Sequence, residues 1–412
     1  MSTPDTTTPS PKTGADIAVL GGGLSGTLAA YLLGRAGYAV MLIDRHRTFP
    51  EQFRAEKLCA DHIETLDRFG LVPALSRRAA AFDTVLNLRH GRLLDRTHSR
   101  HYGILYRDLV ETIRAELPDN VRFVAGQVSG LRTGTRRQRV AIHGQEEVTA
   151  RLLVLATGAG DILRRDLNIA RRVLRAHQSI AFGFDLSLAD RERFARTGVT
   201  CYGDGASDGV DYLTLFPAAG ALRVNLFTYR EPGDSWVRAF RERPNETLAV
   251  TFPRLVETIG SYAVSGRIDS WITDIVVADN HRQDGVVLIG DAFQTSCPAA
   301  GLGVSRLLSD VERLCHVHLP RWMRAGTFAA ADLASFYDDP DKRAMDLYAL
   351  QMADFRRGLT IGTDLGAQLT RGFHFARRRA LHMVDALSPS LAARLREIRQ
   401  GHSRRLAVPE QG

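Results

Sequence analysis

The fold of this chain is decided by residues 16–45, which read DIAVLGGGLSGTLAAYLLGRAGYAVMLIDR. The apolar run 17–20 is typical of a buried strand, and a helix rich in Ala and Leu is predicted over 24–35. A second apolar strand, 39–43, ends at Asp44. This order of strand, helix and strand predicts the start of a doubly wound, mainly parallel sheet, and therefore an α/β fold.

Three glycines join the first strand to the helix in the spacing G-x-G-x-x-G. Gly21 permits the tight turn, Gly23 lets the backbone approach a pyrophosphate, and Gly26 allows the helix to pack closely on the strand. The helix N-terminus offers N–H groups and a positive dipole end to the phosphates. Asp44 lies where a carboxylate can accept hydrogen bonds from a ribose hydroxyl. We therefore expect this stretch to bind a dinucleotide.

The composition is that of a globular protein, with 412 residues, 44% of them hydrophobic and 24% charged. The formal net charge is +8, but the arginines are spread along the chain without interleaved aromatic residues, which argues against a nucleic-acid partner. The four cysteines form no C-x-x-C pair, so neither a disulfide framework nor a metal site is expected.

The N-terminal stretch 1–13 is polar and rich in Pro and Thr, and it is predicted to be a disordered leader rather than a secretory signal. No apolar run reaches the length of a membrane span, so we expect a cytoplasmic protein with no integral membrane segment. The arginine-rich stretches 377–379 and 404–405 are interpreted as solvated helix faces, with a membrane-surface helix as the alternative.

The pattern of predicted strands and helices divides the chain into four parts, the first of which is the leader 1–13. Residues 14–176 and 276–330 alternate buried strands with helices and form one discontinuous dinucleotide-binding domain. Residues 177–275 are rich in strands and form an inserted domain that would bind the substrate. Residues 331–412 are predicted to be a helical C-terminal region.

A second ligand signal lies in the late segment of the dinucleotide-binding domain. The buried strand 286–289 runs into Gly290 and Asp291, and a turn then precedes a helix over 304–314. The turn contains Pro298, Gly301 and Gly303. Like the first helix, this helix points its positive N-terminus at the turn, which predicts a second contact with a negatively polarised ligand.

Taken in order, these motifs resemble those of the single-component flavoprotein monooxygenases, the para-hydroxybenzoate hydroxylase-like family. The family's R-x-x-x-L pattern is matched by Arg54 and Leu58, where we expect a helix to begin, and its next helix resembles the one opened by Arg107. Its late motif, G-D-A-x-H-x-x-x-P-x-x-G-x-G, is closely similar to 290–303. The resemblance implies that non-covalent FAD is bound by Gly21, Gly23, Leu24, Ser25, Gly26, Asp44, Arg45, Arg54, Arg107, Val128, Gly158, Gly290, Asp291, Pro298, Gly301, Leu302 and Gly303.

The chain departs from the family pattern at several positions. Gln294 replaces the usual His of the late motif, and Ser305 replaces a usual Asn. The middle motif D-G-x-x-S-x-x-R aligns with 157–164, where Thr157 and Asp161 replace the Asp and the Ser. In the family this motif serves both FAD and NAD(P)H, so the choice between NADH and NADPH stays open.

The resemblance also implies a reaction. NAD(P)H reduces FAD, dioxygen adds at the flavin C4a position, and the hydroperoxide transfers oxygen to an aromatic or similarly electron-rich small molecule. Arg54 and Pro298 beside the flavin, and Tyr212 and Arg223 on the inserted sheet, are the expected catalytic residues. Further candidates for the substrate site are His101, Tyr202 and Asn225.

Other reactions remain possible on the same architecture. Alkene reductases of the geranylgeranyl type carry Y-x-W-x-F-P, which 212–217 match except for Thr214 in place of Trp. Flavin halogenases carry W-x-W-x-I-P, which is absent here. A flavin-binding module without turnover is a third alternative, and monomer and homodimer both remain open.

A strand over 212–216 would divide its side chains between two faces. Tyr212, Thr214 and Phe216 would face the ligand, whereas Leu213 and Leu215 would point into the interior of the inserted domain. We therefore expect the substrate to lie between the flavin and this sheet.

Overall fold

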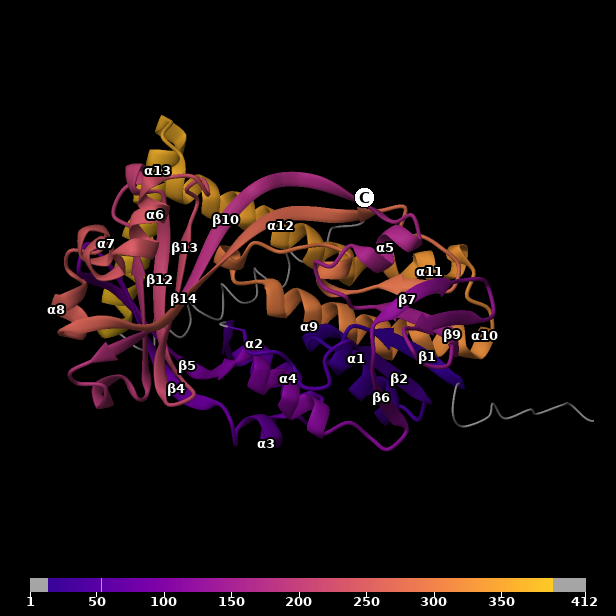
Figure 1. The fold of residues 1–412 in the computed structure, drawn as a ribbon. Helices are drawn as coiled ribbons and strands as arrows, with labels where there is room; N and C mark the ends of the chain where they lie inside the picture. The colour runs from indigo at the N-terminus through magenta and orange to yellow at the C-terminus, as the bar shows by residue number, and fades with distance from the viewer. Residues whose placement is uncertain (1–13, 53, 388–412) are drawn as a thin grey trace, which may run out of the picture.

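The computed structural model describes residues 14–52 and 54–387. Figure 1 shows two lobes, each built around one β-sheet, with helices packed between and around them. The predicted leader, 1–13, and the last part of the predicted helical region, 388–412, lie outside the described residues.

The first lobe is the predicted dinucleotide-binding domain. Its seven-stranded sheet has the order β6-β2-β1-β9-β8-β7, and β15 also pairs with β9. The strands β6, β2, β1, β9 and β15 are parallel, whereas β8 and β7 continue the sheet in antiparallel fashion. The strands are β1 (Gly14–Leu20), β2 (Val40–Asp44), β6 (Val121–Ala125), β7 (Val128–Arg132), β8 (Gln138–Ile142), β9 (Val148–Leu155) and β15 (Val286–Leu288).

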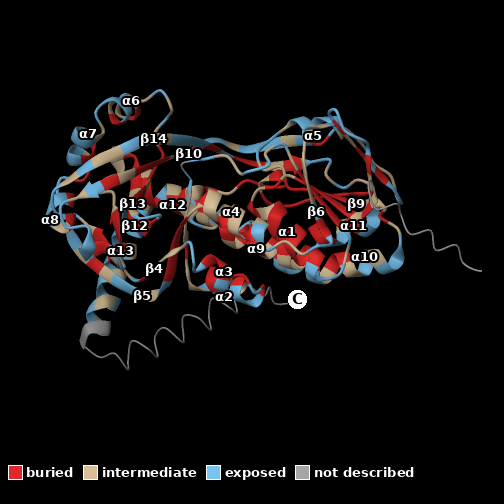
Figure 2. Ribbon diagram, turned by 60° about the horizontal axis from the view of Figure 1, so that its bottom comes forward, coloured by how far each residue is buried: buried red, intermediate tan, exposed pale blue. Residues whose placement is uncertain are grey.

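The helices of this lobe cover the sheet and bury its central strands, which appear red in Figure 2. Because the C-terminal halves of β1 and β9 are buried on both faces, residues 17–20 and 152–155 are continuous apolar runs rather than alternating ones. The helices are α1 (Leu24–Arg35), α2 (Ala60–Arg68), α3 (Val72–Leu75), α4 (Tyr106–Ala115), α5 (Ile162–Asp166), α9 (Gly303–Arg313), α10 (Leu319–Ala325) and α11 (Ala330–Tyr337).

The second lobe contains an eight-stranded sheet of order β14-β10-β13-β12-β11-β4-β5-β3. It extends beyond the predicted range 177–275, because β3, β4 and β5 come from residues 55–105. Neighbouring strands are antiparallel except for β11 and β4. The strands are β3 (Ala55–Leu58), β4 (Ala80–Arg89), β5 (Arg92–Leu105), β10 (Ala170–Leu188), β11 (Thr197–Tyr202), β12 (Val210–Ala218), β13 (Ala221–Thr228) and β14 (Tyr262–Asp279).

The two faces of this sheet have different surroundings. One face packs under α6 (Ser235–Glu242), α7 (Pro244–Thr251) and α8 (Leu255–Ile259), in a core that includes Leu213 and Leu215. Tyr212 and Phe216 belong to separate clusters on the opposite face. The predicted division of side chains along 212–216 is therefore confirmed, and we call the Tyr212 side the inner face of the sheet.

A long ribbon of two strands joins the lobes. Strands β10 and β14 pair from Ala170 with Asp279 to Leu188 with Tyr262, with irregularities in register on the way. Figure 1 shows this ribbon arching from the sheet lobe to the region of α5.

One other prediction of local structure was wrong. Leu58 lies in β3 rather than on the following helix, which begins at Ala60. Residues 244–259 form two helices, α7 and α8, because the chain breaks at 252–254. The C-terminal region forms α12 (Pro340–Ile361) and α13 (Leu365–Leu387). In Figure 1, α12 leads toward the sheet lobe and α13 lies across it.

Candidate functional site

The glycine turn after β1 has the geometry that the sequence predicts. Gly21 has φ +106°, and a Cβ there would lie 2.5 Å from the carbonyl oxygen of Ala156. A Cβ on Gly26 would overlap the carbonyl oxygen of Gly21, so the helix can approach the strand only with glycine at this position. The carboxylate of Asp44 is fixed beside the turn, because it accepts hydrogen bonds from the backbone N–H of Gly22 at 2.6 Å and of His46 at 2.8 Å.

Helix α4 supplies two contacts to this turn that the sequence analysis missed. The Tyr106 hydroxyl accepts a hydrogen bond from the backbone N–H of Leu24 at 3.1 Å. Arg114 donates to the carbonyl oxygen of Gly22 at 2.6 Å. The predicted residue, Arg107, lies between them in the first turn of α4. A local sequence pattern could locate the helix but could not show which of its side chains reaches a turn 80 residues or more away.

Arg54 brings the early and late motifs together. Its guanidinium lies 4.4 Å from the ring centroid of Tyr106, and its Nε is 2.8 Å from a carboxylate oxygen of Glu56. Burial lowers the pKa of Arg54, but Glu56, Tyr106 and Asp291 outweigh this effect and raise it. Burial, with smaller contributions from Glu56 and Asp291, also raises the pKa of Tyr106 against the opposing effect of Arg54. Asp291 of the late motif therefore lies close to residues that surround the glycine turn.

The late motif follows β15 as a short 3-10 turn, Gly290–Ala292. Gly290 has φ +60°, and a Cβ at this position would collide with the Ser25 hydroxyl in the first turn of α1. Its backbone N–H donates to Asp310 at 2.8 Å. The carboxylate of Asp291 remains 44% exposed and lies 3.7 Å from the guanidinium of Arg306, so it is accessible to a ligand.

A buried group of four charged side chains supports this turn. Lys342 donates to Asp310 at 3.0 Å and to Asp346 at 2.8 Å, and Arg306 lies 3.1 Å from Asp346 and 3.5 Å from Asp310. The side chains of Arg306, Asp310 and Lys342 are each 1% exposed. Two cations therefore balance two carboxylates inside the protein, as buried charges require.

The turn at 298–303 leaves its backbone accessible. Pro298–Ala300 forms a 3-10 turn, and Gly301 follows with φ +71°. A Cβ on Gly301 or Gly303 would meet no atom within 4 Å, so the backbone at the start of α9 faces open space. Such a surface fits a flat ring with polar edges, as the flavin of FAD has, while the glycine turn after β1 fits its pyrophosphate. The residues present therefore fit FAD.

The middle motif touches the late one. Arg164 is 1% exposed and donates to the carbonyl oxygens of Ala292 at 3.3 Å and Gly158 at 3.4 Å. It also pairs with Asp161, which stands where the family has a Ser. The structure places Arg45 on the exposed loop after β2 and Val128 at the start of β7, and the role of both in FAD binding stays a prediction.

Two histidines that interact electrostatically, His62 and His101, lie on α2 and β5, and the first of them contacts α9. His62 contacts the hydroxyl of Ser305 at 2.7 Å through Nε2, and burial lowers the pKa of His62 to about 4. Its imidazole is therefore neutral near pH 7. His101 stacks on Phe82 with ring centroids 5.1 Å apart, and burial lowers its pKa, with a smaller contribution from Lys57.

The inner face of the sheet carries the predicted substrate residues. Tyr212 donates to the carbonyl oxygen of Ala299 at 3.1 Å, which ties β12 to the turn at 298–303. Arg223 is 8% exposed and lies 3.1 Å from Asp185. Thr214 stands between them on the same face, opposite Asn225 on β13. Thr214 is 5% exposed, and its hydroxyl has no hydrogen-bond partner among the described residues.

The C-terminal helices close one end of this face. Arg356 of α12 forms a buried ion pair with Asp211 and lies 5.1 Å from the ring centroid of Tyr212. Arg378 of α13 donates to the hydroxyl of Tyr202 at 2.6 Å. Tyr202 is therefore held by a helix, whereas Tyr212, at one end of the strip from Tyr212 to Arg223, contacts the turn at 298–303.

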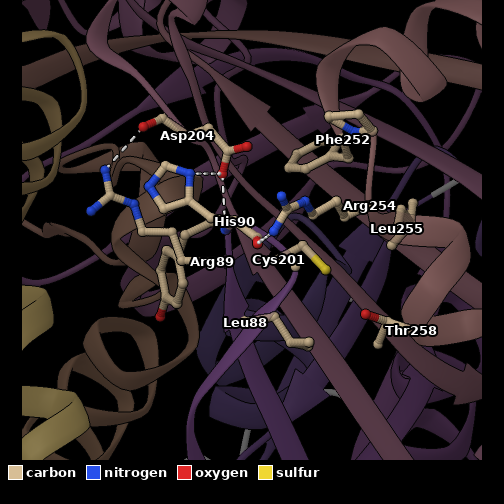
Figure 3. Close-up of a pocket in the computed structure, with 12 residues that line it drawn as sticks. Leu88, Arg89, His90, Cys201, Asp204, Phe252, Arg254, Leu255 and Thr258 are labelled. Atoms are coloured by element: carbon tan, nitrogen blue, oxygen red, sulfur yellow. Dashed lines mark hydrogen bonds and ion pairs between the residues drawn. The ribbon is translucent and has the colours of Figure 1, made fainter.

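A separate pocket in the sheet lobe is lined by Tyr202 together with residues of α8 and of the loop before it (Figure 3). Its polar groups largely pair with each other: Asp204 lies 3.0 Å from the His90 ring, and Arg254 donates to the carbonyl oxygen of His90 at 3.0 Å. Burial raises the pKa of the Cys201 thiol to about 12, so this thiol is protonated near neutral pH. The glycine motifs do not line this pocket, so we do not assign it to the dinucleotide site.

Two expectations about other kinds of site can be compared with the described part of the chain. Within it, no three His, Cys, Asp or Glu side chains are grouped so as to hold a metal ion. None of the helices in residues 14–52 and 54–387 combines the length and apolarity that a membrane span requires.

The fold and the separated early and late motifs indicate an FAD-dependent oxidoreductase, and the family match and the relatives given next support the monooxygenase class. Residues 14–317 match the family model described as FAD binding domain, and the chain belongs to this family. The resemblance seen in the sequence and the predicted α/β fold are thereby confirmed.

Known proteins with related sequences or structures are consistent with this class. Aklavinone 12-hydroxylase from Streptomyces peucetius subsp. caesius is 26% identical over 343 residues, which are 71% of this chain and 65% of that protein. The chain thus spans about two thirds of the length of this curated relative.

Two solved structures show the same fold. p-Nitrophenol 4-monooxygenase from Pseudomonas putida superposes with a TM-score of 0.73 at 18% identity, over 93% of this chain and 97% of that one. A flavin-dependent brominase superposes with a TM-score of 0.66 at 15% identity, over 89% of this chain and 100% of that one.

Proposed function

We propose that the protein uses NAD(P)H and dioxygen to insert one oxygen atom into an aromatic or similarly electron-rich small molecule. FAD would be held by the glycine turn after β1, by Asp44 and Asp291, and by the turn at 298–303. When bound, FAD supplies the redox chemistry and the oxygen transfer, which side chains alone cannot perform. The protein's own residues must bind and orient the substrate and exclude water.

The observation that carries this proposal is the contact between the inner face of the sheet and the flavin motif. The hydrogen bond from Tyr212 to Ala299 sets β12 directly beside the turn that would face the flavin. The next inner-face residue is Thr214, whose buried hydroxyl has no hydrogen-bond partner among the described residues. A buried hydroxyl without a partner is costly, and a polar group of the substrate would satisfy it.

The charges along this strip favour a substrate with a polar or anionic substituent. The guanidinium of Arg223 is paired with Asp185, and burial raises the pKa of that carboxyl against the opposing effect of Arg223. The ion pair supplies one fixed donor group beside Thr214 and the aromatic rings of the inner face. A phenol offers a flat ring for that surface and a hydroxyl for the polar strip, and the names of the hydroxylase and the p-nitrophenol monooxygenase support an aromatic substrate.

The test is a screen of phenols, quinolones and polyketide aromatics for stimulated NAD(P)H oxidation, with the product mass examined for a gain of one oxygen. Thr214→Val keeps the volume of the side chain and removes its hydroxyl. We expect this variant to raise KM about ten-fold or more, the effect of one lost hydrogen bond, with FAD content unchanged. Thr258→Val, in the pocket of Figure 3, is the matched control and should behave as the wild type.

Two further variants test the predicted substrate residues. Tyr212→Phe and Arg223→Ala should change substrate-dependent NAD(P)H oxidation far more than they change FAD content. A bound substrate analogue that contacts only residues beyond 330 would show that the C-terminal helices form the pocket and that this assignment is wrong.

A second candidate is the reduction of an alkene. It rests on the pattern at 212–217, in which Tyr212, Phe216 and Pro217 match the reductase motif and Tyr212 and Phe216 lie on the inner face. The same screen separates the two reactions, because an oxygenase consumes one dioxygen for each product formed. A reductase instead adds two hydrogens to the product and works without dioxygen.

A further inference from the structure

Helix α13 presents an apolar stripe to solvent. Leu365, Leu369 and Phe373 are 72%, 65% and 70% exposed. Their spacing of four residues places them on one side of the helix. Met383, which is 57% exposed, falls on the same side at 3.6 residues per turn. We call these four residues the outer stripe of α13.

The opposite side of α13 is anchored to the protein by arginines and by the buried ring of Phe375. Arg378 donates to both carboxylate oxygens of Asp95, at 2.6 and 3.0 Å. Arg371 donates to the carbonyl oxygens of Leu359 and Gly362, each at 2.6 Å. A surface helix normally buries its apolar side and exposes its polar one. Here these contacts fix α13 with the outer stripe facing away from the protein, so the stripe has no partner in the described structure.

The charges around the stripe indicate what covers it. At 100° per residue, Arg377 and Arg379 flank the stripe on its two sides, and both are exposed. The sequence of α13 contains four arginines and one acidic residue, Asp385. A second copy of the chain would bring the same arginines against themselves, which is unfavourable. An anionic lipid surface would instead accept the apolar side chains below its headgroups and pair the arginines with phosphates.

The position of the helix allows such contact. Figure 1 shows α13 at the edge of the sheet lobe, with its far end extending past the neighbouring elements. In Figure 2 one end of α13 extends from the lobe, and much of its described part is pale blue, the colour of exposed residues. A flat surface can therefore approach α13 from outside. We propose that the outer stripe of α13 docks the protein reversibly on an anionic membrane surface, with the helix lying in the plane of the interface.

The experiment uses the full-length, FAD-loaded protein and sedimentation with two kinds of vesicle. One kind contains phosphatidylcholine alone, and the other contains phosphatidylcholine with phosphatidylglycerol. We expect binding to the anionic vesicles that weakens as salt is added, because headgroup attraction is screened. The double variant Leu369→Ser/Phe373→Ser should lower the partition coefficient by roughly ten-fold or more. Arg377→Glu/Arg379→Glu should abolish the preference for the anionic vesicles.

Val250→Ser is the matched control, since Val250 is 82% exposed on α7, away from α13. It should bind vesicles as the wild type does, and flavin absorbance should show that every variant is folded. Failure of the wild type to bind anionic vesicles would overturn the proposal, as would equal binding by the stripe variant. A dimer in solution that Leu369→Ser/Phe373→Ser dissociates would assign the stripe to a second copy and would also overturn it.

Discussion

Replacing Asp310 with asparagine should lower the free energy of unfolding by about 3–5 kcal/mol, the cost of leaving a buried charge unpaired. Asp310 accepts from the backbone N–H of Gly290 at 2.8 Å and from Lys342 at 3.0 Å, and it lies 3.5 Å from Arg306. Asparagine has nearly the same volume and can still accept from Gly290. The loss of stability therefore reports the missing negative charge, because the two buried cations are left with one buried carboxylate, Asp346.

A second substitution separates this explanation from simple disruption of packing. Lys342→Met, introduced together with Asp310→Asn, leaves one cation, Arg306, and one carboxylate, Asp346, so the buried charges balance again. We expect the double variant to be more stable than Asp310→Asn alone. Urea unfolding followed by far-UV circular dichroism measures each variant and gives the coupling energy. A cost below about 1 kcal/mol for Asp310→Asn, or strictly additive losses in the double variant, would refute the reasoning.

Three further predictions address the cofactor and its surroundings. Purified protein should release FAD, and not FMN, into the supernatant on acid precipitation, since two separated motifs fit a dinucleotide; a yellow pellet would instead indicate covalent attachment. Asp291→Ala should weaken FAD binding about ten- to hundred-fold through the loss of one charged hydrogen bond, measured by flavin fluorescence titration, and an unchanged Kd would contradict its placement. Burial lowers the pKa of His62 from 6.5 to about 4, so the unfolded chain takes up a proton first as the pH falls. The contribution of neutral, buried His62 to the free energy of unfolding, up to about 3 kcal/mol, should be fully present above pH 6.5 and lost as the pH falls toward 4. The free energy of unfolding of His62→Gln should depend less on pH in this range.

The parts of the site that could be predicted from the sequence are those made by consecutive residues. The turn at Gly21 and the Gly290–Asp291 pair each combine a buried strand, a backbone that only glycine tolerates and a helix N-terminus. Residues close together in the sequence meet all of these requirements, so the sequence itself shows the pattern. The alternation along 212–216 was also predictable, because a strand places successive side chains on opposite faces.

The parts that could not be predicted depend on contacts between distant residues. Arg114 reaches Gly22 across 92 positions, and Lys342 reaches Asp310 across 32. In the sequence each of these is an ordinary polar residue of an amphipathic helix. The range of the second sheet was underestimated for the same reason. The pairing of β4 with β11 is decided by tertiary packing, and nothing in residues 80–89 indicates that their partner lies at 197–202.

Strands that pair in one sheet lie far apart in the sequence, so the protein can fold only after the later strands have been synthesised. Strand β9 pairs with β1 on one side and with β15 on the other, so the central sheet is incomplete until residues 286–288 have been synthesised. Leu155 of β9 and Val286 are 131 positions apart, and at about 5–20 residues per second this edge of β9 waits on the order of 7–26 s for β15. During this time the C-terminal half of β9 exposes an apolar edge that can pair with other chains. Slower growth at low temperature and an abundance of chaperones should therefore raise the yield of soluble protein, whereas chains truncated before residue 286 should aggregate.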